Sequence, residues 1–158
     1  MPRKFVVVAV IELLVGVALV FYASALTLPG RRLVGRVADF PPSAEPYAVM
    51  DAGRVAFYLV NLAGELLALE PDQPTRPAQC WARWDEVHQV YSDPCYGARY
   101  TLDGAWCDGP AVRDLDRYAV EVNNGRVWVY TDYVIAGTPR EVTSKANGSS
   151  SPGCPIPP

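Results

Sequence analysis

An unbroken apolar run from Phe5 to Leu26 limits what this chain can become more than any other feature. The run is 22 residues long and contains one ionisable side chain, Glu12. About 20 consecutive apolar residues are needed for a helix to cross the hydrocarbon core of a bilayer. Arg3 and Lys4 precede the run, and positively charged residues favour the cytoplasmic side of a membrane. We therefore expect a single-pass membrane protein whose N-terminus is cytoplasmic and whose remaining chain is extracytoplasmic, either periplasmic or extracellular.

A cleaved signal peptide is the alternative interpretation of the same run. Ala23-Ser24-Ala25 has the small residues of a cleavage site. The apolar stretch is nevertheless longer than the usual signal-peptide core of about 7–15 residues. The length favours an uncleaved anchor.

Glu12 is unusual because a carboxylate within a membrane span is costly and generally faces protein rather than lipid. It could be protonated or lie near the inner interface, it could bond to another subunit's helix, or it could relay protons. No second charged group accompanies it in the span, which disfavours a relay. We expect Glu12 to contact a partner subunit.

The charge of the chain argues against nucleic-acid binding. The formal net charge is −3, and no cluster of Lys and Arg forms a basic face. Proteins that track phosphates need such a face.

Beyond the span the sequence predicts short strands and no convincing helix. Asn123-Asn124-Gly125 separates two of these strands and is a strong hairpin signal, because Asn and Gly tolerate the positive φ angles of tight turns. From Ser144 to Pro158 the chain is small, polar and rich in Pro, which predicts an extended or disordered segment. The predicted strands are Leu33–Val37, Tyr47–Met50, Val55–Val60, Leu66–Leu69, Gln89–Tyr91, Arg99–Leu102, Tyr118–Val122 and Arg126–Tyr130.

Several motifs in the second half of the chain resemble the Rieske iron–sulfur family. They are Cys80 followed by Trp84-Asp85, then Asp93-Pro94-Cys95-Tyr96-Gly97, Tyr100-Thr101-Leu102-Asp103-Gly104 and Gly109-Pro110-Ala111 with Arg113-Asp114-Leu115. The likeness extends over roughly Leu33 to Thr131. It implies an all-β fold, a Rieske-like antiparallel β-sandwich with one N-terminal transmembrane helix. The expected organisation is a cytoplasmic N-terminus (1–4), a transmembrane helix (5–26), a linker (27–32), a Rieske-like β domain (33–137) and a Pro/Ser/Gly-rich tail (138–158).

The resemblance also implies where the cluster ligands of the family belong. Family members carry Cys-x-His-x-x-Cys and Cys-x-Cys-His-Gly, and two Cys and two His hold a [2Fe–2S] cluster. Thr75 and Pro77 occupy the first pair of ligand positions here, and Asp93 and Tyr96 occupy the second pair. Of these four, only Asp93 could bind iron usefully. We therefore expect no cofactor and no metal, with an atypically ligated [2Fe–2S] cluster as the alternative.

The cysteines that remain at matching positions are those that the family joins in a disulfide, Cys80 and Cys95. Cys107 and Cys154 lie outside both motifs. A Cys107–Cys154 disulfide would attach the tail to the β domain; the alternatives are two free thiols, or a bond from Cys154 to another chain.

These features predict an accessory, non-redox subunit of a larger membrane complex. The resemblance implies partners among the membrane subunits of a respiratory or photosynthetic complex, contacted through an aromatic tip near Trp81 and Tyr96. Two alternatives remain: an electron-transfer subunit with atypical ligands, and an extracellular module that uses the aromatic tip to bind a ligand. We expect no enzymatic activity and no catalytic residues, because the oxygenases of the family need a second, iron-bearing catalytic domain.

Overall fold

The computed structural model describes residues 30–72, 80–139 and 153–154. The expected transmembrane helix 5–26, including Glu12, lies outside these residues. Within the described ranges, no helix has the length and apolar character needed to cross a bilayer.

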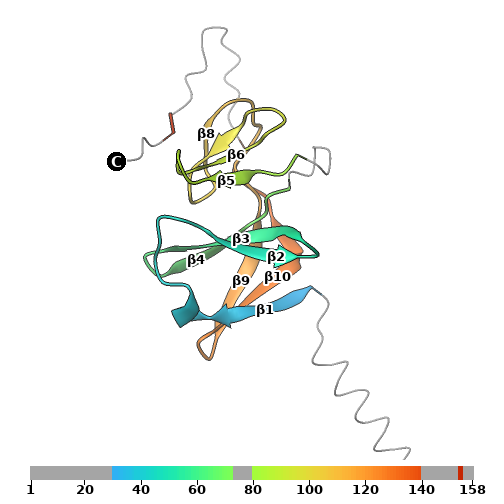
Figure 1. Ribbon diagram of the computed structural model, residues 1–158. Coiled ribbons are helices and arrows are strands. Elements are labelled where there is room, and N and C mark those ends of the chain that lie inside the picture. The colour runs from blue at the N-terminus through green and yellow to red at the C-terminus, as the bar shows by residue number, and fades with distance from the viewer. Residues whose placement is uncertain (1–29, 73–79, 140–152, 155–158) are drawn as a thin grey trace, which may run out of the picture.

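Ten β-strands and one turn of 3-10 helix make up the described chain (Figure 1). All strand pairings are antiparallel, so the expected all-β antiparallel fold is confirmed. The elements are β1 (Arg31–Arg36), η1 (Val37–Asp39), β2 (Tyr47–Asp51), β3 (Arg54–Leu62), β4 (Glu65–Leu69), β5 (Arg83–Asp85), β6 (Val90–Ser92), β7 (Arg99–Tyr100), β8 (Trp106–Asp108), β9 (Arg117–Asn123) and β10 (Arg126–Ile135).

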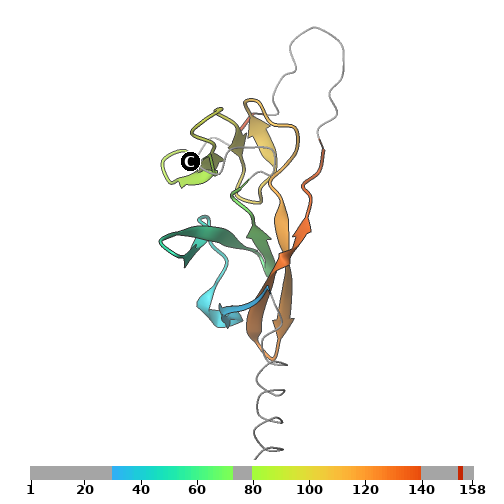
Figure 2. The ribbon, with the colours of Figure 1, turned by 90° about the vertical axis from the view of Figure 1, so that its right-hand side faces the viewer.

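The strands form two sheets, which we call the base sheet and the tip sheet. The base sheet has the order β1-β10-β9-β4-β3-β2, and the tip sheet has the order β5-β6-β7-β8. The Arg32 side chain donates a hydrogen bond to the Met50 carbonyl at 2.8 Å, which links the two edge strands of the base sheet. In both ribbon views the tip sheet lies at one end of the molecule, and β1 and the β9–β10 turn lie at the other end (Figures 1 and 2).

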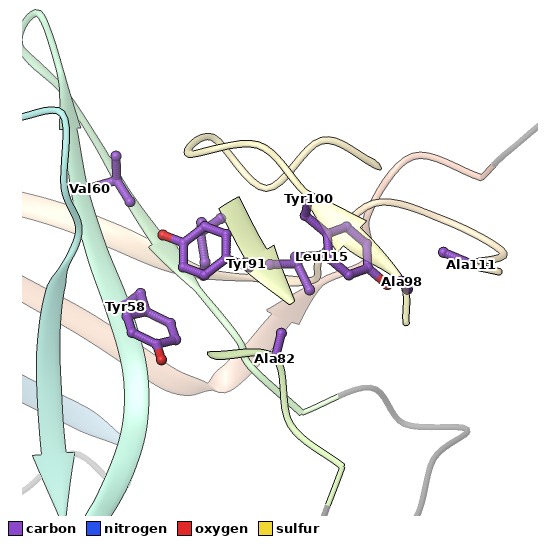
Figure 3. Packing of buried hydrophobic residues seen from close by; sticks show 9 residues of the cluster. Tyr58, Val60, Ala82, Tyr91, Ala98, Tyr100, Ala111 and Leu115 are labelled. Carbon is purple, nitrogen blue, oxygen red and sulfur yellow. The ribbon is translucent and has the colours of Figure 1, made fainter. Parts of the chain in front are cut away.

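Strand β3 explains how the two sheets share one core. Successive side chains of a strand point to opposite faces. Phe57 and Leu59 therefore pack within the base, against Val127 and Val129 of β10. Tyr58 and Val60 point the other way and join the buried cluster of the tip sheet (Figure 3), which also contains Leu69, Ala82, Tyr91, Ala98, Tyr100, Ala111 and Leu115. The unbroken apolar sequence of β3 thus reflects burial on both faces.

The hairpin predicted between β9 and β10 is present. Asn124 and Gly125 both have positive φ angles, of 50° and 71°. Such paired values match the tight turns whose twist suits antiparallel strands. The sequence signal therefore identified both the turn and its conformation.

The observed elements extend the expected ones at several points. β1 begins at Arg31, inside the expected linker 27–32, and Pro139 pairs with Arg113 from within the expected tail 138–158. β10 continues to Ile135 through a register shift between Tyr130 and Val134. Two short strands, β5 and β8, were not predicted, although β6, which is equally short, was expected at Gln89–Tyr91.

Candidate functional site

The two loops of the tip that correspond to the cluster-binding motifs are joined by a disulfide. Cys80 and Cys95 are bonded at 2.07 Å, with their Cα atoms 5.6 Å apart. Cys80 precedes β5 and is buried, whereas Cys95 lies in the exposed turn between β6 and β7. The disulfide therefore fixes the second loop against the segment that leads into the first strand of the tip sheet.

Asp93 shapes the second loop from within. Its side chain is 4% exposed, and Oδ1 accepts the backbone N–H of Cys95 at 2.9 Å and of Tyr96 at 3.4 Å. Its own carbonyl accepts the N–H of Gly97 at 2.9 Å. An Asp side chain that bonds to backbone two or three residues ahead stabilises a turn in this way. At this position, where the resemblance puts a metal ligand, the carboxylate thus supports the loop's own backbone.

Trp81 and Tyr96 each follow one half of the disulfide. The Cα atoms of the two cysteines are 5.6 Å apart, and consecutive Cα atoms are separated by about 3.8 Å. The Cα atoms of Trp81 and Tyr96 therefore lie within about 13 Å of each other. Tyr96 is 51% exposed, and Trp81 is partly exposed with the guanidinium of Arg83 5.3 Å from its ring centroid. An aromatic pair thus accompanies the disulfide on the surface of the tip.

The structure places His88, the only histidine of the sequence, but not the remaining two ligand positions. Thr75 and Pro77 lie outside the described residues. His88 Nδ1 is 2.8 Å from the Asp85 carboxylate in the turn between β5 and β6. This hydrogen bond is the main cause that lowers the pKa of Asp85. His88 is therefore engaged in a local turn.

A second disulfide reaches the tail. Cys107 of β8 is bonded to Cys154, 47 residues further along, with a Cα separation of 4.8 Å. Cys107 is 1% exposed. The expectation of disulfide bonds is thus confirmed, and the sulfur of Cys154 is bonded within the same chain.

The donor set does not fit a Rieske cluster. Such a cluster needs two Cys thiolates and two His nitrogens. The chain has four Cys and one His, and all four cysteines are in disulfides. No group of three or more His, Cys, Asp or Glu side chains in the described ranges has a metal-binding arrangement. The mismatch between this domain and the ligand set of a Rieske cluster therefore rests on the chemistry of the available side chains.

A buried ion pair, missed by the sequence interpretation, holds the chain where the tip meets the base. Arg113 donates to both carboxylate oxygens of Asp116, at 2.8 and 2.6 Å. The Asp116 side chain is 1% exposed and also accepts the N–H of Gly137 at 2.8 Å. The Asp116 carbonyl accepts the N–H of Glu70, which follows β4. Asp116 thus connects the ends of three segments. In the sequence it lies in the charged stretch Arg113-Asp114-Leu115-Asp116-Arg117, which gives no sign that its side chain is buried.

An open pocket at the other end of the molecule was also not predicted. It has a volume of about 440 Å³ and is lined by Arg31, Asn123, Asn124, Arg126 and Trp128. We call it the base pocket. The sequence offered only the Arg31-Arg32 pair after the apolar run as a signal.

Comparisons with known proteins point to one family. No family model matches the chain. An iron–sulfur subunit of the cytochrome b6-f complex of Chlorobaculum tepidum is 30% identical over 107 residues, which is 68% of this chain and 57% of that protein. The chloroplastic subunit of the same name from Bigelowiella natans is 36% identical over 58 residues, or 34% of this chain and 23% of that protein. Subunit 2 from Nostoc sp. is 36% identical over 50 residues, or 32% and 28% of the two chains.

Among solved structures, a complex of reduced oxygenase and oxidised ferredoxin in carbazole 1,9a-dioxygenase superimposes with a TM-score of 0.45 at 19% identity, over 65% of this chain and 94% of that chain. The chain spans little more than half the length of the first of its sequence relatives. The likeness to the iron–sulfur subunits, together with the antiparallel β fold and the disulfide at the matching cysteines, leads to one conclusion: the chain contains a Rieske-like domain.

Proposed function

We propose that the chain is an accessory, non-redox subunit of a membrane electron-transport complex. One observation carries this proposal: all four cysteines are in disulfides, so a domain related to iron–sulfur subunits has no thiolate with which to hold iron. What remains of the site is its framework, namely the disulfide and a turn organised by Asp93. Shape and surface are then what the domain can contribute.

The proposed setting is a membrane. Residues 5–26 would anchor the chain as a single span with residues 1–4 in the cytoplasm, and the β domain would lie outside. The relatives are named as subunits of the cytochrome b6-f complex, which supports a role in a membrane assembly. Two disulfides in one small domain also support an oxidising compartment, because disulfides persist there and are rare in the cytosol.

The proposed contact surface is the pair Trp81 and Tyr96. Aromatic residues are enriched at protein interfaces because they bury a large apolar area at a small cost in side-chain entropy. Tyr96 is 51% exposed, and Cys95 beside it is covalently fixed. A rigid, exposed aromatic ring loses little freedom on binding. Glu12 would add a contact within the membrane.

Such a subunit would act by mass action. Any component that binds only the assembled form of a complex stabilises that form in proportion to its concentration and affinity. Neither electron transfer nor catalysis is needed. The partners would be other membrane subunits of a respiratory or photosynthetic complex.

Purification of the full chain from its native membrane in mild detergent tests the proposal. We expect co-migration with a large complex, and we expect Trp81→Ala with Tyr96→Ala to reduce recovery of the partners at least tenfold. Tyr133→Ala removes a 65% exposed ring from β10 and serves as the matched control that retains them. Migration as a monomer would contradict the accessory role and favour a free-standing binding module.

A further inference from the structure

The base pocket has features of an anion site. It is lined by the first residue of β1 and by residues of the β9–β10 hairpin. Both ribbon views place β1 and this hairpin at the end of the molecule remote from the tip sheet (Figures 1 and 2). Its volume of about 440 Å³ is within the range of small-ligand sites. Two guanidinium groups, two amides and an indole line it, so hydrogen-bond donors dominate its wall.

Arg31 is positioned by an aromatic ring rather than by a full set of acceptors. Its guanidinium carbon is 4.1 Å from the centroid of the Trp128 ring. The Glu121 carboxylate is 3.7 Å away, an ion-pair distance that is too long for a hydrogen bond. Arg31 Nε is buried and has no hydrogen-bond partner in the described part of the chain. Nε is thus closed to a ligand, and the terminal guanidinium nitrogens, whose contact with Glu121 is an ion pair at 3.7 Å, are the groups that can bond to one.

The charges around the pocket leave one positive charge in excess. Glu121 accepts hydrogen bonds from Tyr130 and from Asn123, and the bond from Tyr130 is the main cause that lowers its pKa. The ionised carboxylate therefore offsets one of the two arginines. Arg126 is exposed and forms no ion pair with any described residue. A monoanion, such as a phosphodiester, matches this balance.

The position of the pocket identifies the source of that anion. Leu26, the last residue of the expected span, is five residues before Arg31, a distance of at most about 18 Å in a fully extended chain. The polar layer on each side of a bilayer is roughly 5–8 Å thick. Trp side chains favour this layer because the ring is apolar and its N–H is polar. A pocket with Arg31 and Trp128 beside the end of a span is thus within reach of lipid headgroups.

We propose that the base pocket binds the phosphodiester group of an anionic membrane lipid. The inference rests on the membrane anchoring proposed above. Arg31 and Arg126 would contact the phosphate oxygens, the amides of Asn123 and Asn124 would bond to the rest of the headgroup, and Trp128 would lie at the level of the glycerol. Bound lipid would hold the base end of the domain on the bilayer, with the tip sheet facing away from it.

Lipid binding to the full chain in detergent tests the proposal. The delipidated protein is titrated with phosphatidylglycerol, with phosphatidylcholine of the same acyl chains, and with inorganic phosphate, and bound lipid is counted by native mass spectrometry. We expect phosphatidylglycerol to bind preferentially. We expect Arg126→Gln to weaken it about fivefold, since one arginine near a charged surface contributes about that factor, and Arg31→Gln with Arg126→Gln to abolish the preference.

Arg83→Gln, which removes one positive charge from the tip sheet, is the matched control and should bind as the unaltered chain does. Unchanged thermal midpoints without lipid would show that the variants fold. Equal binding of the two lipids, or inorganic phosphate binding as tightly as phosphatidylglycerol, would overturn the proposal. A chain that fails to enter liposomes at all would instead contradict the membrane anchoring, so the two failures are distinguishable.

Discussion

The Asp93 carboxylate accepts the backbone N–H of Cys95 at 2.9 Å. This contact joins Asp93, at a position where the resemblance puts a metal ligand, to Cys95, which is half of the disulfide. The carboxylate fixes the loop through backbone hydrogen bonds, and the disulfide fixes it covalently. The loop is thereby organised by groups of the protein alone.

Asp93→Ala should destabilise the fold, because two backbone N–H groups of a partly buried turn lose their acceptor. Leaving such groups unsatisfied costs about 1–3 kcal/mol. Asp93→Asn retains an oxygen at the same place and should cost less. Urea unfolding of both variants checks this, and equal losses of stability would show that the charge rather than the acceptor matters.

The two disulfides should differ in their contributions to stability. On the chain-entropy model a crosslink stabilises by about 3 kcal/mol for a loop of roughly 15 residues and by about 4 kcal/mol for one of nearly 50. Cys107→Ser with Cys154→Ser should therefore lower the free energy of unfolding more than Cys80→Ser with Cys95→Ser, since the sequence separations are 47 and 15. Denaturant unfolding of both double variants measures the order. The reverse order would mean that the tail is held only weakly in the folded state.

Asp116→Asn should be among the most destabilising single changes. It leaves Arg113 without its bidentate partner in a site where the carboxylate is 1% exposed. Breaking a buried ion pair from one side costs about 3–5 kcal/mol. Asp51→Asn makes the same chemical change at an exposed ion pair with Arg32 and should cost about 0–1 kcal/mol. Comparable losses at both sites would contradict the role we assign to Asp116.

Glu70 should make stability depend on pH in a characteristic direction. Burial is the main cause that raises its pKa, opposed by a hydrogen bond from Tyr118. When the pKa of a carboxyl group is higher in the folded state than in the unfolded state, its ionised form destabilises the fold. This destabilisation begins as the pH rises through the pKa of the unfolded state and is complete above the pKa of the folded state. Glu70→Gln should therefore increase stability at pH 7 and change it little near pH 3.5. An increase of the same size at both pH values would show that ionisation is not the cause.

The sequence predicted the parts of this fold that depend on local pattern. The apolar run within β3 and the turn at Asn124-Gly125 were visible because strands and tight turns impose strict local demands on residue type. Strands β5 and β8 were not visible, because strands of three residues carry little pattern of their own and are recognised only by their pairing with β6 and β7.

The candidate site was likewise predictable from the sequence only in part. The resemblance indicated the pairing of Cys80 with Cys95, but spacing alone left the partners of Cys107 and Cys154 open, because a contact over 47 residues depends on the tertiary fold. The base pocket was missed for the same reason, because its residues come from β1 and from the β9–β10 hairpin. Arg113 and Asp116 are only three residues apart, but the burial of their ion pair depends on a segment distant in sequence, which Gly137 represents.

Iron analysis of the full chain, expressed where iron–sulfur clusters are assembled, tests the central claim most directly. The purified protein would be examined for iron by mass spectrometry, for thiols after denaturation without reductant, and for a paramagnetic signal in the reduced state at low temperature. We expect less than about 0.1 iron per chain, no reactive thiol and no signal, because all four cysteines are in disulfides and the cluster needs two thiolates. About two irons per chain with a Rieske-type signal would contradict the account.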